Sequence, residues 1–359
     1  MSLLAEKKEV RKIQFTGRST YILSLPKKWI EEMSLQPGDP VTIVRQINNA
    51  LLILPSIVTK SSKTGEAAVI VTPNESGNSL KRMVISIYLA GYNVIHIKSK
   101  SGRIAPQQKD AIREVVRRNL VGTEIIADSS DYITIQVLMS LPELSVSSAL
   151  RRMFLIASSM HRDAINALKE LNADLANGVI KSDDEVDRFS LYIMRNLVIA
   201  SQNERILREV GLKNPSDCLS YRVTVKSVER IADHASSIAE KIKDVKERPN
   251  PKLIQKIAEM SNHALSVFED AIESLLRRDY ALADKVAENA SVVKKLEQDA
   301  LDILAKSHQN NVGNYKLILE DIRRTADYSS DISEAAMNQT IEEVITVRVY
   351  LSEVNSTNP

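Results

Sequence analysis

Three carboxylates lie close together in the stretch ERIADHASSIAE, residues 229–240. If this stretch is an α-helix, which turns about 100° per residue, then Glu229, Asp233 and Glu240 fall within about 40° of one another. The apolar residues of the same stretch fall on the opposite side, where a helix packs on its core. Carboxylates grouped in this way form either a solvated helix face or a site for a hard cation such as Mg²⁺, Mn²⁺ or iron.

The same pattern occurs a second time. RTADYSSDISE (324–334) aligns with RIADHASSIAE (230–240), and six of the eleven residues are identical. Four carboxylates of the second stretch fall within about 60° on one helix face; they are Glu320, Asp327, Asp331 and Glu334. An earlier pair of segments, 160–176 and 267–283, is also similar. This repetition predicts two related units of three helices, with the acidic motif on the third helix of each.

The second helix of each unit offers further acids. SDDEVD (182–187) places Asp183 and Asp187 one turn apart, and Glu297 occupies a comparable place in the second repeat. In the alternative interpretation, Ser182 and Glu185 form a capping box and the acids only favour a helix start. Di-iron oxidase chemistry is not expected, because no Glu-x-x-His is present.

The order of patterns along the chain predicts three kinds of structure. Residues 9–55 read as short strands around one brief helix, and residues 67–142 as a small α+β sandwich in the order β-α-β-α-β-β. Residues 143–345 read as six helices in antiparallel bundles. The breaks between these helices are expected at turn-forming residues, near 177–178, 213–215, 249–251, 279–280 and 310–314.

Composition limits the class of protein. The net charge is only +2, but the first 28 residues carry seven Lys or Arg, so a polyanion is expected to bind that end alone. Cys218 is the single cysteine, which excludes an internal disulfide and thiolate metal sites. With neither a signal peptide nor a run long enough to span a bilayer, the protein is expected in the cytoplasm and not in the membrane. Catalytic triads and phosphate-binding loops are also missing, so we do not expect an enzyme.

ERIADHASSIAE resembles the helix motif of the PhoU family of phosphate-uptake regulators, in which an acid, three residues and an Asp recur in each of two repeats. The resemblance covers roughly residues 145–345. It implies a six-helix fold, metal clusters bound by these acids, and phosphate transporter or signalling components as partners. Carried over to this chain, Glu229 and Asp233 match the motif in the first repeat and Asp327 matches it in the second. With the neighbouring acids Asp187, Glu297, Glu320 and Asp331 they are the candidate metal ligands. Arg323 stands where the second repeat should have its Glu.

The N-terminal run EVRKIQFTGRSTYILSLPKKWIEEMSLQPGDPVTI is similar to the AbrB (SpoVT-like) family of swapped-hairpin DNA-binding domains. This resemblance implies that two chains interlace their hairpins into one barrel, so a homodimer is expected. It also implies that basic residues face double-stranded DNA; they are Arg11, Lys12, Arg18, Lys27 and Lys28. The alternative is that these side chains are simply a solvated rim.

We therefore expect a multidomain chain with a small all-β swapped-hairpin head (1–58), an α+β sandwich linker domain (66–142), and an all-α region of two three-helix repeats (143–247 and 250–347). The expected function is a DNA-binding transcriptional regulator of phosphate uptake. Its helical bundle is expected to sense phosphate status and to hold Fe, Mn or Mg. The alternative is an accessory protein that regulates a phosphate transporter by direct contact and does not bind DNA.

Overall fold

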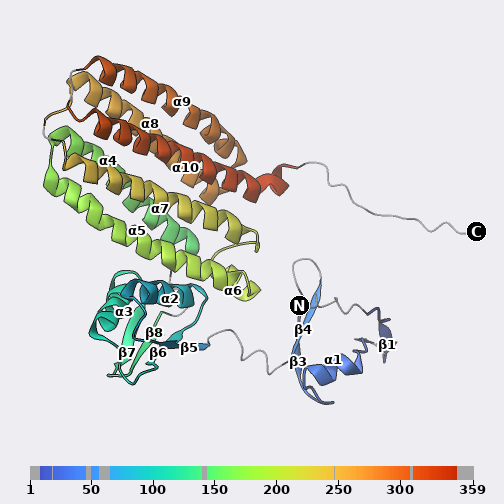
Figure 1. Cartoon of the computed structure of the whole chain (residues 1–359). Coiled ribbons are helices and arrows are strands. Elements are labelled where there is room, and N and C mark those ends of the chain that lie inside the picture. Colours follow the sequence, from blue (N-terminus) through green and yellow to red (C-terminus); the bar gives the residue numbers. More distant parts are fainter. Residues whose placement is uncertain are drawn as a thin grey trace, which may run out of the picture. The chain divides into compact units, whose positions relative to one another are not determined.

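The computed structural model describes residues 9–17, 19–45, 50–55, 65–139, 144–245, 247–307 and 310–345. The chain divides into two units, Met1–Gly65 and Glu66–Pro359. The helices and strands are shown in Figure 1. The predicted fold class is confirmed: a small β-rich head, a mixed α/β middle and an all-helical remainder follow one another. None of the described helices is both long and apolar enough to cross a membrane.

The first unit contains two short antiparallel hairpins and one short helix. Strand β1 pairs with β2, and β3 pairs with β4. The elements are β1 (Gln14–Thr16), β2 (Thr20–Ile22), α1 (Lys27–Glu32), β3 (Val41–Arg45) and β4 (Leu51–Pro55). Pro26 precedes α1 in an extended conformation, which suits a residue whose ring fixes φ. The Asn48–Asn49 turn predicted between β3 and β4 lies outside the described residues.

The middle of the chain is a four-stranded sheet in the order β5-β6-β8-β7. Strands β5 and β6 are parallel, and the other pairs are antiparallel. The elements are β5 (Glu66–Val71), α2 (Gly77–Leu89), β6 (Val94–Ser99), α3 (Pro106–Arg118), β7 (Thr123–Asp128) and β8 (Tyr132–Val137). Helices α2 and α3 cover one face of the sheet (Figure 1) and bury an apolar core against it. The predicted β-α-β-α-β-β order is therefore confirmed.

The helical region consists of two three-helix groups with a short helix inside the first. The first group is α4 (Val146–Glu170), α5 (Ala173–Ala200), α6 (Glu204–Glu209) and α7 (Asp217–Ile242). The second is α8 (Pro251–Arg277), α9 (Tyr280–Lys306) and α10 (Val312–Val344). One continuous apolar core runs through both groups, and α7 and α10, the two motif helices, pack against each other.

The predicted helix break near 177–178 is wrong, because α5 runs through this segment. The chain turns earlier. Leu171 ends α4 with a left-handed φ of 53°, and the Asn172 side chain accepts hydrogen bonds from the backbone of Asp174 and Leu175. These bonds satisfy amide groups that a helix start leaves free, so Asn172 rather than the later glycine sets the boundary.

The sandwich is attached to the bundle through Arg195 of α5. This side chain is buried, and its guanidinium lies 4.7 Å from the centre of the Tyr88 ring on α2. It donates hydrogen bonds to the carbonyl oxygens of Tyr88 and Gly91 and to Oδ1 of Asn93, the last at 2.6 Å. Gly91 has φ +97°, and a Cβ at this position would lie 3.0 Å from the Ile199 side chain, so the close approach requires glycine.

Candidate cation site and nucleic-acid interface

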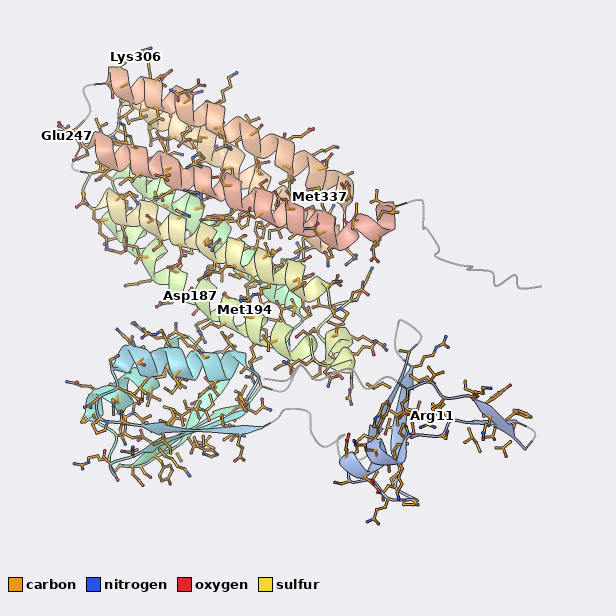
Figure 2. The ribbon with its side chains drawn as sticks, turned by 45° about the vertical axis from the view of Figure 1, so that its right-hand side comes forward. Arg11, Asp187, Met194, Glu247, Lys306 and Met337 are labelled. Carbon is orange, nitrogen blue, oxygen red and sulfur yellow. The ribbon has the colours of Figure 1, made fainter. Side chains whose placement is uncertain are left out.

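The acids of the first repeat come from two helices that pack side by side. Asp183 and Asp187 of α5 lie within electrostatic range of Glu229 and Asp233 of α7. We call these four residues the first-repeat acid cluster. Asp183, Asp187 and Glu229 are partly buried, and Asp233, at the rim of the group, is the most exposed of the four. Figure 2 labels Asp187 on α5.

Crowding in the first-repeat acid cluster disfavours the ionised carboxylates. Burial, and then the charges of Asp233 and Asp187, raise the pKa of Asp183 to about 7. Burial, and then the charges of Glu229 and Asp233, raise the pKa of Asp187 to about 6. Burial followed by the charge of Glu229 also raises the pKa of Asp233. A cation bound among these carboxylates would therefore reduce the electrostatic repulsion between them.

Positive charge near the first-repeat acid cluster comes from α7, the helix that also carries Glu229 and Asp233. Lys226 forms an ion pair with Glu229, and Arg230 and His234 lower the pKa of Asp233 against the upward shift. The Lys226 side chain is 47% exposed, so this ion pair is weak in water. The cluster keeps an excess of negative charge despite these neighbours.

Four carboxylates fit the oxygen ligands that a hard cation prefers. They are not preassembled: among the described residues, no group of three or more His, Cys, Asp or Glu side chains is arranged so that it could hold a metal ion. Any ion here would therefore have to draw the carboxylates together from α5 and α7. The assignment of Asp187, Glu229 and Asp233 as metal ligands stays a prediction.

The capping box predicted at Ser182 and Glu185 is wrong, because both residues lie inside α5. The Ser182 hydroxyl donates to the carbonyl of Gly178, and Glu185 pairs with Arg188 one turn along the helix. The acids of this stretch therefore do not serve a helix start. Asp183 joins the first-repeat acid cluster, a role that could have been found from its four-residue spacing to Asp187.

The second repeat has a different arrangement of charge. Arg323 of α10 lies among three acids, Glu297 of α9 and Glu320 and Asp327 of its own helix. We call these three acids the second-repeat acid cluster. Asp331 has no ion pair with Arg323 among the described residues, but it lies within electrostatic range of Glu334 and Asp327 on its own helix and of Arg230 on α7. The assignment of Glu297, Glu320, Asp327 and Asp331 as metal ligands also stays a prediction.

The predicted DNA-binding residues belong to the first unit. Arg11 and Lys12 precede β1, and Lys27 and Lys28 begin α1. All four are exposed. Arg11 pairs with Glu9, and Lys27 lies 3.6 Å from Glu31 on the same helix. Arg18 lies outside the described residues. These exposed cations suit contacts with phosphate groups.

The first unit has almost no core of its own. Among the residues of this unit whose side chains the structure describes, only Pro26 is buried, although the strands are rich in apolar side chains. Tyr21 is 72% exposed, Ile43 61% and Leu51 64%. Apolar strand faces left in water are unfavourable, so a unit of this size needs a further surface to cover them.

Two family models match separate parts of the chain. A model described as PhoU domain matches residues 150–242 and 257–336. A model described as antidote-toxin recognition MazE, bacterial antitoxin, matches residues 14–63. No curated protein matches the chain.

Two solved structures are similar to part of the chain. One is PhoU from Pseudomonas aeruginosa, with 22% identity and a TM-score of 0.49; the match covers 55% of this chain and 96% of that one. The other is the phosphate transport system regulatory protein PhoU from Streptococcus pneumoniae, with 18% identity and a TM-score of 0.47; it covers 56% of this chain and 96% of that one.

Proposed function

Since the chain joins a MazE/AbrB-like domain to a PhoU domain in two repeats, we propose that it is a DNA-binding regulator of phosphate uptake. In this proposal the head binds double-stranded DNA as a homodimer, and the bundle responds to phosphate status directly or through transporter or signalling components. The observation that carries the proposal is the head itself, in which the described part of the chain combines exposed basic residues with apolar strands whose side chains are mostly exposed.

A second copy of the head explains both features together. Pairing two heads would cover the apolar faces of β3 and β4, and it would double the number of basic side chains on one small body. Each lysine or arginine that neutralises a phosphate releases condensed counterions, which makes binding tighter at low salt. Arginine adds a planar fork that can bind guanine edges in two places, whereas lysine acts as a point charge.

The test is binding of the full chain to genomic fragments at low and moderate salt. We expect a preferred subset of fragments that stays bound at moderate salt. If Lys27 and Lys28 each neutralise one phosphate, replacing both with alanine should lower the salt dependence, as the slope of log K against log salt, by roughly 1.8 per chain. Lys294→Ala with Lys295→Ala, a pair of exposed lysines on α9, is the matched control and should leave DNA binding unchanged.

No preference among fragments, together with co-purification of a phosphate transporter subunit, would instead support the accessory-protein alternative. Genome-wide occupancy with and without phosphate would then show no regulated sites. If the protein is the proposed regulator, phosphate supply should change its occupancy at a defined set of promoters.

We also propose that the first-repeat acid cluster binds a hard cation, namely Mg²⁺, Mn²⁺ or iron. Supporting this are the shared location of four carboxylates on α5 and α7, and the burial and mutual repulsion that raise the pKa of Asp183 and Asp187. The cation would supply positive charge to which phosphate oxygens can also bind.

Elemental analysis of the purified chain tests this proposal. Glu229→Ala with Asp233→Ala should lose bound metal, whereas Glu240→Ala, an exposed acid further along α7, should retain it. Equal metal content in all three proteins would remove the cation assignment.

A further inference from the structure

We propose that the guanidinium of Arg323 is the resident cation of the second-repeat acid cluster, so that this cluster is closed to divalent metal ions. The inference concerns a different group of side chains from the first-repeat acid cluster. It extends the proposed cation binding to the second repeat, where the residues present do not fit a metal.

Arg323 directs all three of its nitrogens at carboxylates. Nε lies 3.1 Å from Oε2 of Glu297, Nη1 pairs with Oδ2 of Asp327, and Nη2 lies 3.7 Å from Oε1 of Glu320. The acids belong to two helices, α9 and α10, so the guanidinium bridges them as a bound ion would. The Arg323 and Glu297 side chains are only 22% and 18% exposed, which limits competition from water.

The neighbouring Arg324 does not hold the cluster in the same way. It lies 3.6 Å from Glu320 and 3.9 Å from Asp327, and its side chain is 42% exposed. No contact between Arg324 and Glu297 is found in the described part of the chain. Bridging of the two helices by an arginine is therefore a property of Arg323.

The two repeats carry opposite charges at one pair of equivalent sequence positions, 229 and 323. Alignment of the two motifs places Arg323 opposite Glu229, and Asp327 opposite Asp233. One repeat therefore has a carboxylate where the other has a guanidinium. In the first-repeat acid cluster burial and neighbouring acids both raise the pKa of Asp187. Burial also raises the pKa of Glu297, but there the charge of Arg323 and its hydrogen bond oppose the rise.

A divalent ion in the second-repeat acid cluster would have to displace this arginine. The guanidinium already uses oxygens of all three acids, and a metal ion beside it would meet a like charge. Removing the guanidinium while keeping the acids should therefore create a cation site. This makes Arg323→Ala a gain-of-binding variant.

The experiment counts Mn²⁺ bound per full-length chain, with free Mn²⁺ measured by electron paramagnetic resonance. Arg323→Ala should bind one more Mn²⁺ than wild type, and adding Glu297→Gln to it should abolish the gain. Arg324→Ala is the matched control and should bind as wild type does. A folded Arg323→Ala chain that gains no Mn²⁺ overturns the inference.

A second measurement keeps Arg323 in place, so it does not depend on whether Arg323→Ala folds. In the wild-type background, Glu297→Gln with Asp327→Asn should leave the number of bound Mn²⁺ ions unchanged. A decrease would show that the second repeat holds metal despite Arg323, and would overturn the inference. If wild type binds no Mn²⁺ at all, the cation proposal for the first repeat fails, but a gain in Arg323→Ala still supports the role of Arg323.

Discussion

Nδ1 of His234 on α7 lies 2.8 Å from Oδ1 of Asp321 on α10, and this contact joins the motif helices of the two repeats. The other carboxylate oxygen of Asp321 accepts a hydrogen bond from Nζ of Lys241 at 2.9 Å. His234 also stacks on Tyr328, with ring centres 5.6 Å apart. His234 therefore contributes to the packing of one repeat on the other, and its counterpart in the sequence repeat, Tyr328, is its neighbour in space.

Replacing Asp321 should destabilise the bundle. Asp321→Asn removes the charge that pairs with His234 and Lys241, and the Asp321 side chain is only 10% exposed. We expect the free energy of unfolding to fall by about 1.5–3 kcal/mol, the usual contribution of a hydrogen bond to a charged group. Urea unfolding measures this. Asp302→Asn, an exposed acid on α9, should change stability little.

Stability should fall as pH rises through the range set by the first-repeat acid cluster. The pKa of Asp183 is raised to about 7 and that of Asp187 to about 6, whereas an unfolded aspartate has a pKa of about 3.9. Between these values the folded chain binds more protons than the unfolded chain. Protonated Asp183 and Asp187 therefore make their full contribution to the free energy of unfolding below about pH 4. This contribution is lost as pH rises towards 7.

Urea midpoints of wild type and Asp183→Asn, measured with a chelator across this pH range, test that expectation. The variant should show a shallower decline than wild type, because one of the two titrating groups is gone. Asp302→Asn, at an exposed acid of α9 whose charge does not shift either pKa, should follow wild type. Parallel curves for wild type and Asp183→Asn would contradict the prediction.

Arg195→Ala should loosen the attachment of the sandwich to the bundle. It leaves the carbonyls of Tyr88 and Gly91 and the amide of Asn93 without their charged donor. Each such hydrogen bond contributes about 1.5–3 kcal/mol, so α2 should exchange its amide hydrogens faster. Hydrogen exchange read by mass spectrometry gives the result. Arg205→Ala, an arginine with a side chain 86% exposed, is the control, and equal exchange in both variants would count against this role of Arg195.

Ile43→Asp should weaken dimer formation through the head. Ile43 is 61% exposed within one chain and lies opposite Ile53 in the β3–β4 hairpin. If a second head covers this face, a buried unpaired carboxylate there would be strongly unfavourable. Sedimentation should show a shift towards monomer, with the helical signal in circular dichroism retained. Lys28→Ala should stay dimeric, and a monomeric wild type would overturn the premise.

Much of the fold was predictable because its signals are local. The identical residues shared by 230–240 and 324–334 predict the two repeats. Within each motif, the helix period places the acids and the apolar residues on opposite faces. Alternating strand and helix patterns identified the sandwich in the same way. The helix boundary near residue 172 was missed, because it depends on one Asn side chain that caps two backbone amides.

Sequence patterns are enough to predict the order of the β-rich, mixed and helical regions, the repetition of the bundle and the positions of most acids along each helix. Tertiary structure alone decided which acids meet. It brings Asp183 to Asp233 across α5 and α7, and it places Arg323 against Glu297 across α9 and α10. The physical reason is that periodicity fixes the face of a helix on which a residue lies, whereas the packing of helices decides which charge lies opposite it.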